Sequence, residues 1–338
     1  MKEIKYLLPN QPEFYKANLH THTTISDGNL SREEAKEAYK KLGYQILCLT
    51  DHNVIADHSD LSEPDFLMLT GIEIGVRAPD RSTVGGEVYH MNLIAKEPDI
   101  LWTPTKVKGK YPEAAKYEEK MQCEGMKLQC NPDSINAMIE KATEKGFLVM
   151  YNHPTWSCQS YPSYAPLKGL CGMEVRNSEC CLLGLNENNV HVYKDLLSLG
   201  NRIYPLGTDD MHKPRALGLS WIMVGAEALD YASVIKALEN GDFYMSCGPE
   251  ITDLYIEENI LKIRCSEAQR INVETSGRCA GLFTNGDAPI RYAEFDLSTC
   301  FDGLQNNPNT FFFVTVTDKY GNYAVTRGYF IKDLIEEK

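Results

Sequence analysis

Six of the eight histidines in this 338-residue sequence lie in short polar clusters that also hold the candidate acidic metal ligands, and each cluster lies at the end of an apolar run. Imidazole and carboxylate groups together bind zinc, manganese or iron. The strand ends of a barrel converge in space although they are far apart in sequence. The pattern therefore predicts a metal site assembled from successive strand ends. The clusters are His20-Thr21-His22 with Ser26-Asp27-Gly28, Thr50-Asp51-His52-Asn53, Gly71-Ile72-Glu73, Tyr89-His90, Asn152-His153-Pro154 and Thr208-Asp209-Asp210-Met211-His212.

The first cluster has the spacing of a ligand pair. Residues i and i+2 of an extended segment point to the same side, so His20 and His22 face one ion together. Glu73 and Asp210 arrive from other strand ends with negative charge that offsets the charge of a cation, and Glu73 can bridge two ions. A cation held in this way lowers the pKa of bound water toward neutrality and supplies hydroxide, so no side-chain nucleophile is required.

The competing interpretation is that these are unrelated core or surface residues. An isolated histidine at a strand end is more often structural than metal-bound, and His90 could be a core histidine. The repetition of histidine beside acidic or amide residues favours the metal site for the set as a whole. His58 and His191 lack such neighbours, and we expect both at the surface. Asp209 competes with Asp210 as a ligand, but the Asp-x-His spacing favours Asp210.

Strand and helix segments alternate through the first part of the chain. A capping box at Ser31 and Glu34 begins a helix that ends at Gly43, and Asn131-Pro132 begins another that ends at Gly146. This alternation predicts a parallel sheet with helices outside it. The expected strands are 45–49, 67–74, 88–95, 147–151, 172–175 and 202–206, and a further helix is expected at 188–199.

Two stretches depart from the alternation. Residues 97–131 are rich in proline, lysine and glutamate and predict an insertion over the active site, as a lid or substrate cap. After Gly248-Pro249, short alternating strands separated by turn residues predict a small all-β domain of sandwich type. We therefore expect a domain over 1–249 and a second over 250–338. The expected strands of the second are 254–263, 271–275, 291–297 and 311–317.

The composition narrows the function classes. A net charge of −13 and the absence of a Lys/Arg run disfavour non-specific binding to nucleic acid. No segment resembles a signal peptide or is long enough to span a membrane, so we expect a cytoplasmic protein without a membrane partner. The eleven cysteines are odd in number, and we expect most of them to be reduced thiols.

Recognition of a phosphate group requires cationic or amide donors near the metals, because guanidinium groups pair with phosphate oxygens. Arg176 follows a strand and Arg215 follows the last histidine cluster, so both are candidate substrate-binding residues; either could instead form a surface salt bridge. Glu174 alternates with its apolar neighbours, which leaves two interpretations open, a residue that points into the barrel or a structural ion pair with an arginine.

Over residues 16 to about 215, the order and spacing of these motifs resemble the PHP superfamily (polymerase and histidinol phosphatase). The resemblance implies a distorted (β/α)7 barrel, a centre of two or three divalent ions and hydrolysis of phosphoesters. Residues 237–249 and 321–330 are also similar to a bacterial branch with a C-terminal β-sandwich, which includes carbamate-ester hydrolases.

The resemblance also implies a ligand set for each ion. Asp27 stands where some members have histidine, which bears on the metal that the second site selects. The implied catalytic residues are Glu73, Asp210 and His212. The first ion would take His20, His22, Glu73 and Asp210; the second would take Asp27, His52 and His212; the third would take Glu73, His90 and His153.

Three functions follow as hypotheses. The leading one is a metal-dependent phosphoesterase that hydrolyses a small phosphorylated molecule, with a nucleotide as one candidate, by attack of a metal-bound hydroxide. The second keeps the metal centre but cleaves a carboxylic or carbamate ester, which would require an apolar acyl pocket without an arginine near the metals. The third is a metal-stabilised binding protein whose β-sandwich docks a partner; the intact ligand set argues against it.

Overall fold

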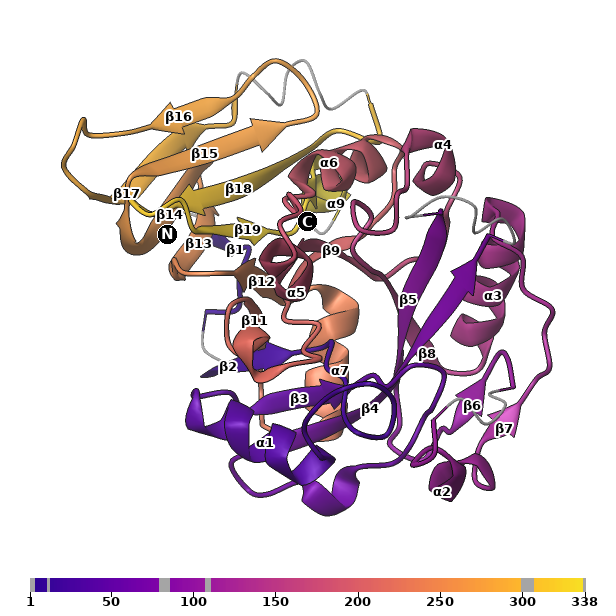
Figure 1. Ribbon diagram of the computed structural model, residues 1–338. Helices are drawn as coiled ribbons and strands as arrows, with labels where there is room; N and C mark the ends of the chain where they lie inside the picture. The colour runs from indigo at the N-terminus through magenta and orange to yellow at the C-terminus, as the bar shows by residue number, and fades with distance from the viewer. Residues whose placement is uncertain (1–3, 11–12, 79–85, 107–110, 299–306, 337–338) are drawn as a thin grey trace.

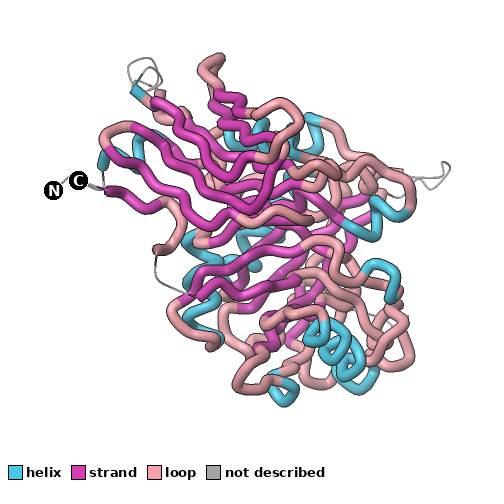
Figure 2. The backbone as a smooth tube through the Cα atoms, turned by 90° about the vertical axis from the view of Figure 1, so that its left-hand side faces the viewer, coloured by secondary structure: helices cyan, strands magenta, loops and turns pink. Residues whose placement is uncertain are grey.

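The computed structural model describes residues 4–10, 13–78, 86–106, 111–298 and 307–336, which form a mixed α/β structure (Figure 1). Within these residues the strands form a 14-stranded mixed sheet, a four-stranded antiparallel sheet and a two-stranded one. Both views place the strands that follow residue 250 at one end of the molecule (Figures 1 and 2).

The first half of the large sheet carries the predicted ligands. Strands β2 to β4 are parallel to one another, and β8 to β10 are parallel to one another. The strands follow the order β10-β9-β8-β5-β4-β3-β2. Their bounds are β2 (Glu13–Asn18), β3 (Ile46–Leu49), β4 (Leu67–Arg77), β5 (Val88–Ala95), β8 (Phe147–Tyr151), β9 (Gly172–Asn177) and β10 (Tyr204–Thr208).

Strand β5 departs from the all-parallel sheet that the sequence predicted. It runs antiparallel to both β4 and β8, because no helix of the described residues carries the chain from β4 back to the start of a parallel neighbour. The path of strands is also not closed by a ladder among the described residues. The segments beyond β2 and β10 meet at one isolated bridge, Thr21 to Met211, so a closed barrel is not confirmed.

The second half of the large sheet is antiparallel and continues from β2 to the chain end. It has the order β11-β12-β19-β18-β15-β16, with β20 paired to β18. Pairing of β12 with β19 crosses residue 249, and the division at that position stays a prediction. The bounds are β11 (Trp221–Ala226), β12 (Phe243–Ser246), β15 (Arg270–Thr275), β16 (Gly281–Phe283), β18 (Phe311–Thr317), β19 (Tyr323–Thr326) and β20 (Tyr329–Phe330).

The four-stranded sheet has the order β1-β13-β14-β17, with β1 (Ile4–Tyr6), β13 (Ile251–Glu257), β14 (Ile260–Ala268) and β17 (Ile290–Asp296). The single strand predicted at 254–263 is wrong. The chain turns at Glu258 and Asn259, which have φ of 52° and 71°, as a two-residue hairpin turn requires. The turn was missed because glutamate rarely occupies such a position.

Strand β18 separates two hydrophobic cores. Phe311 and Phe313 pack in the larger core together with the strands that carry the ligands, whereas Phe312 and Val314 pack in the second core. Alternate residues of a strand point to opposite faces, which explains why this segment is apolar at consecutive positions.

Helices cover the large sheet. Helix α1 begins with the predicted capping box of Ser31 and Glu34, and Asn131 caps α3. Buried side chains of α3, α6 and α7 belong to the larger core. The helices are α1 (Arg32–Lys41), α2 (Ala115–Glu118), α3 (Pro132–Glu144), α4 (Tyr161–Tyr164), α5 (Ser178–Leu182), α6 (Val190–Ser198), α7 (Tyr231–Asn240) and α9 (Ile331–Glu336), with 3-10 turns at Ser59–Leu61 and Pro214–Ala216.

The insertion forms a small unit beside the sheet. It contains β6 (Trp102–Thr103), α2 and β7 (Gln122–Cys123), with β6 and β7 paired in parallel. Its Tyr111 and Ala114 pack with Ile25 and Val54, two residues away from Asp27 and His52 respectively. The insertion therefore supports the loops that carry these two predicted ligands.

None of the helices in the described parts of the chain has the length and apolar character that crossing a bilayer requires. Nine described cysteines are free thiols, in keeping with the expectation, whereas Cys279 is disulfide-bonded.

Gly241, which ends α7 with a φ of 70°, provides a test of the packing around β10. An added Cβ would overlap the ring of Tyr204, the first residue of β10. We predict that Gly43→Ala, at a φ of 78° with open space around it, costs about 1–2 kcal/mol in the free energy of unfolding. Gly241→Ala should cost about 1–3 kcal/mol more, because overlap adds to the backbone strain. If urea unfolding showed the same loss of unfolding free energy for Gly43→Ala and Gly241→Ala, the packing described around Tyr204 would be contradicted.

Candidate metal centre

The predicted ligands converge because of the strand directions. His20 and His22 follow β2, His52 follows β3, and Asp210 and His212 follow β10, so they meet at the carboxyl ends of parallel strands. His90 joins them from near the start of β5, because an antiparallel strand has its amino end at that edge; His90 lies opposite Gly75. His153 follows β8.

The first ligand set has atoms spaced as one ion requires. The Nε2 atoms of His20 and His22 are 3.1 Å apart, and each is 3.1 Å from Asp210 Oδ1. Glu73 Oε1 is 3.4 Å from His20 Nε2, and Glu73 Oε2 is 3.3 Å from His22 Nε2. Four ligands at the usual zinc distances are separated by about 3.3 Å in a tetrahedral site. His20, His22 and Glu73 therefore fit a single ion, and Asp210 adjoins the two histidines.

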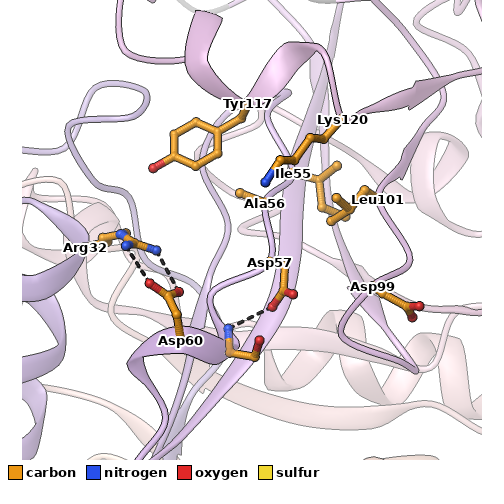
Figure 3. A pocket seen from close by; sticks show the side chains of 10 residues that line it. Arg32, Ile55, Ala56, Asp57, Asp60, Asp99, Leu101, Tyr117 and Lys120 are labelled. Carbon is orange, nitrogen blue, oxygen red and sulfur yellow. Dashed lines mark hydrogen bonds and ion pairs between the residues drawn. The ribbon is translucent and has the colours of Figure 1, made fainter.

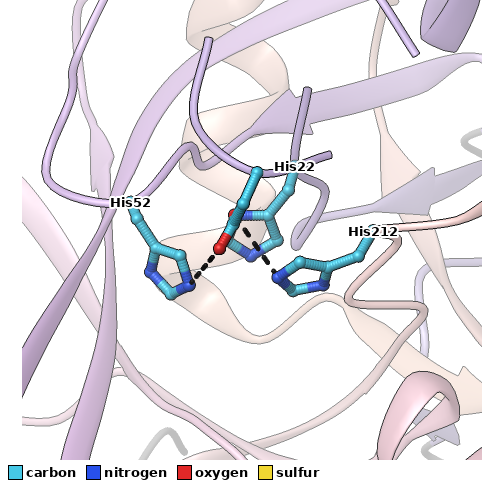
Figure 4. Close-up of side chains that lie close together, drawn as sticks. His22, His52 and His212 are labelled. Carbon is cyan, nitrogen blue, oxygen red and sulfur yellow. Dashed lines mark ion pairs between the residues drawn. The ribbon is translucent and has the colours of Figure 1, made fainter. Parts of the chain in front are cut away.

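The second set surrounds Asp27. The rings of His22, His52 and His212 face one another (Figure 4), with the ring centroid of His22 4.5 Å from that of His52 and 4.0 Å from that of His212. Asp27 Oδ1 is 3.5 Å from His212 Nε2, and Asp27 Oδ2 is 3.8 Å from His52 Nε2. His22 joins this set, which the motif-based assignment gave as Asp27, His52 and His212.

The third set is centred on Glu73. Its Oε1 lies 2.9 Å from His90 Nδ1 and 3.4 Å from His153 Nε2. Its Oε2 lies 2.8 Å from His52 Nδ1. Glu73 thus touches histidines of all three sets, which is the arrangement that a bridging carboxylate needs.

Two buried carboxylates give this cluster its negative charge. Glu73 Oε2 and Asp210 Oδ1 are buried and face the nitrogens of His52, His22 and His20 at 2.8–3.3 Å. Burial alone would raise the pKa of Glu73, but His90, His52 and His20 hold it well below its usual value. Burial would also raise the pKa of Asp210, which His20 and His22 lower. Two ionised, buried carboxylates require cations or protons beside them.

Three histidines are oriented by a contact to the ring nitrogen that faces away from the cluster. His153 Nδ1 lies 3.2 Å from Ser157 Oγ, and His212 Nδ1 lies 2.9 Å from the carbonyl oxygen of Asp210. His20 Nδ1 lies 2.6 Å from Glu174 Oε1. Each contact leaves Nε2 turned toward the carboxylates, as a metal-binding imidazole requires.

Glu174 is therefore a supporting residue, and among the described residues its ion-pair partner is His20 and not an arginine. It is fully buried and accepts hydrogen bonds from Thr208 Oγ1 at 2.6 Å, Asn177 Nδ2 at 2.9 Å and the backbone N–H of His153 at 2.9 Å. Its carboxylate therefore connects β9 to three segments that carry predicted ligands, namely those of His20, His153 and Thr208.

Two further buried carboxylates hold ligand loops without reaching the cluster. Asp51 accepts hydrogen bonds from the backbone and hydroxyl groups of Thr23 and Ser26, in the loop that carries His22 and Asp27. Asp209 accepts three backbone N–H bonds from residues 218–220. Both oxygens of Asp209 are thus occupied, whereas its neighbour Asp210 points to His20 and His22.

A cavity of about 340 Å³ opens onto the cluster. Beside the predicted ligands, its wall contains charged and apolar side chains that the sequence gave no reason to select. They are Arg77, Trp156, Glu179, Cys180, Leu183 and Lys213.

The predicted substrate-binding arginines are not among the described residues that line this cavity. Arg176 lies with its guanidinium carbon 5.8 Å from the ring centroid of Tyr323. Arg215 pairs with Glu179 at 2.7 Å. A position after a strand or a histidine cluster does not specify the direction of a long side chain, which is why neither placement followed from the sequence.

The described insertion residues line a different cavity, of about 510 Å³ (Figure 3). Asp99, Leu101, Tyr117 and Lys120 face the segment 55–60 there, and Arg32 forms a two-pronged pair with Asp60. Within this segment, His58 is 3% exposed, so its predicted surface position is wrong. Its ring lies 6.5 Å from that of Tyr117, between centroids, and Tyr117 packs against a small satellite core that the polar sequence around His58 concealed. His191 is exposed, as predicted.

Comparison with known proteins supports the resemblance over one segment. The sequence model of the PHP domain family matches residues 18–101, which confirms the resemblance there. The match includes the first four clusters and ends before His153, Asp210 and His212. A search of curated proteins found no match.

Several solved structures align with the chain at low similarity. A two-domain protein from Bacteroides vulgatus, which contains a predicted PHP-like metal-dependent phosphoesterase, is 15% identical with a TM-score of 0.42, over 98% of this chain and 92% of that one. An amidohydrolase from Chromobacterium violaceum is 15% identical with a TM-score of 0.38, over 58% and 87%. A lesion-specific endonuclease from Pyrococcus furiosus is 14% identical with a TM-score of 0.40, over 67% and 56%. TM-scores this low do not show a shared fold.

Glu174→Gln tests the supporting role of this carboxylate. The amide keeps the size of the side chain but removes the charge that stabilises the Nδ1–H form of His20. We predict that affinity for Zn²⁺ or Mn²⁺ falls by about 10–100-fold, measured by titration calorimetry, with little change in circular dichroism. The matched control is Glu140→Gln on the exposed side of α3. Unchanged affinity in Glu174→Gln would contradict the assigned role.

Metal binding should release protons at neutral pH. Burial lowers the pKa of His22, but Asp210 and Glu73 outweigh it and raise the pKa to about 10; Glu73 likewise raises the pKa of His153 to about 9. Both imidazoles are then protonated in the metal-free protein at about pH 7. Because a metal ion must displace those protons, the affinity of the protein for the ion should rise from about pH 7 to about pH 9. Calorimetry in buffers of different ionisation enthalpy measures the release. An affinity that is independent of pH over this range would contradict the prediction.

Proposed function

We propose that this protein is a metal-dependent hydrolase that cleaves phosphoric esters of small molecules. One observation carries the proposal: the same cavity joins a buried histidine and carboxylate cluster to two cationic side chains, Arg77 and Lys213. The cluster fits divalent ions, and the cations fit an anionic substrate group.

The centre that we propose holds two or three divalent ions of zinc, manganese or iron. Support comes from the number of candidate ligands, which exceeds what one tetrahedral ion can use, and from the three neighbouring groups that they form. Bound ions lower the pKa of water toward neutrality and withdraw charge from phosphoryl oxygens. We retain the distorted seven-stranded barrel as part of this proposal, with the Thr21 to Met211 bridge as its support.

We assign separate roles in the reaction to the residues of the cluster and of the cavity wall. Glu73 and Asp210 keep the cluster negative and bring the three sets together, and His212 presents Nε2 toward Asp27. Arg77 and Lys213 are exposed at the cavity, where they neutralise phosphate oxygens that the metals do not contact. The buried supporting carboxylates prevent rearrangement of the ligands when the substrate binds.

Carboxylic or carbamate ester hydrolysis is the second candidate. The apolar side chains Trp156 and Leu183 in the cavity wall favour it, since an acyl group would bind there. Arg77 in the same wall argues for the phosphoric ester, because a neutral ester offers no anionic group to this guanidinium.

Activity measurements test the proposal. We predict that metal-replete protein contains two or three ions per chain and hydrolyses an aryl phosphate. Arg77→Ala and Lys213→Ala should each lower kcat/KM about tenfold or more, mainly through KM, because each removes a charge-assisted contact. The matched control is Lys236→Ala, an exposed lysine that pairs with Glu227 outside the cavity.

Two results would contradict the proposal. One is a metal content of at most one ion per chain after reconstitution. The other is turnover of aryl acetates or carbamates without turnover of aryl phosphates, which would establish the second candidate.

A further inference from the structure

Three apolar side chains line the metal-facing cavity. They are Trp156, Cys180 and Leu183, which we call the apolar wall. The wall begins directly at the predicted ligands, because the ring of Trp156 lies 5.3 Å from that of His90 and 5.0 Å from that of His153, between centroids. A group bound near the metals therefore cannot be far from the indole.

Leu183 is the exposed part of the apolar wall. It is 56% exposed, whereas Leu182 and Leu185, which are 44% and 38% exposed, do not line the cavity. Cys180 and Leu183, three residues apart on and just after α5, lie on the same side of that turn. An apolar group bound in the cavity would remove part of the exposed Leu183 side chain from water, which is favourable.

The wall is also held in a fixed position. Asn177 accepts a hydrogen bond from the backbone N–H of Cys180 at 3.0 Å, and the N–H of Glu179 donates to the carbonyl of Asp209 at 3.0 Å. The Glu179 carboxylate pairs with Arg215. On the other side, the backbone N–H of Trp156 donates to buried Glu187. The apolar surface is thus built before any ligand arrives.

The lining of the same cavity also contains Arg77, Lys213 and Glu179, so charged and apolar groups both face the space beside the metal cluster. We propose that the apolar wall is the leaving-group subsite, and that it selects phosphate esters of flat, apolar alcohols, such as aryl esters. The proposal rests on the phosphoesterase function above. With the phosphate held by the ions and the two cations, the ester carbon chain or ring has Trp156 and Leu183 as its contacts. An indole favours a flat partner because aromatic pairs stack or pack edge to face.

Binding of two non-hydrolysable anions to the metal-loaded, full-length protein tests the subsite. Phenylphosphonate and methylphosphonate share the anionic group and differ in the apolar one. By titration calorimetry, phenylphosphonate should bind about tenfold more tightly, which corresponds to about 1.4 kcal/mol. Leu183→Ser and Trp156→Ala should each reduce this ratio toward one while the methylphosphonate affinity stays unchanged.

The controls separate the subsite from the metal centre. Leu199→Ser replaces another exposed leucine, 44% exposed against 56% for Leu183, at the end of α6 and outside the cavity, and should leave the ratio unchanged. Because Trp156 contacts two predicted ligands, metal content is measured for its variant, and Leu183→Ser decides the outcome if that variant loses metal. Equal binding of both phosphonates, or a ratio that Leu183→Ser leaves intact, would overturn the subsite alone. Failure of both phosphonates to bind would overturn the phosphoesterase function and the subsite with it.

Discussion

The structure depends on the burial of Glu73 and Asp210 among six histidines. Burying ionised carboxylates without compensating charge costs several kcal/mol per group. Here Glu73 is 1% exposed, and its Oε2 and Asp210 Oδ1 face histidine nitrogens. Protonated histidines can supply the positive charge. However, the Nε2 atoms of His20 and His22, which are 3.1 Å apart, each lie 3.1–3.4 Å from an oxygen of Asp210 and of Glu73, which fits a divalent ion better than a set of protons.

The rest of the centre follows from the need to hold these atoms together. A buried carboxylate whose two oxygens accept hydrogen bonds from neighbouring segments acts as a support, whereas Glu73 and Asp210 each turn an oxygen toward several histidine nitrogens. By this criterion Glu174, Asp51 and Asp209 belong to the scaffold, and Glu73 and Asp210 belong to the site. The distinction explains how so many acidic residues coexist in one small region of a protein with a net charge of −13.

Local patterns in the sequence predicted the parts of the centre that depend on local geometry. The i, i+2 spacing of His20 and His22 depends on a few neighbouring residues. The same is true of the capping box of Ser31 and Glu34. The partner of His20, Glu174, is 154 residues away, and no spacing rule connects them. The antiparallel direction of β5, which brings His90 to the cluster, and the directions of Arg77, Arg176 and Arg215 depend likewise on tertiary packing. The match to the PHP domain covers residues 18–101. The assignment of the later ligands, His153, Asp210 and His212, therefore rests on the geometry of the structure.

Anomalous diffraction from crystals of protein loaded with Zn²⁺ or Mn²⁺ tests the central claim most directly. The account predicts a strong anomalous peak among His20 Nε2, His22 Nε2, Glu73 and Asp210, with further density beside Asp27 and His52. A metal-loaded crystal without a peak among the first four side chains, in which Glu73 and Asp210 are instead satisfied by protonated histidines, would contradict it.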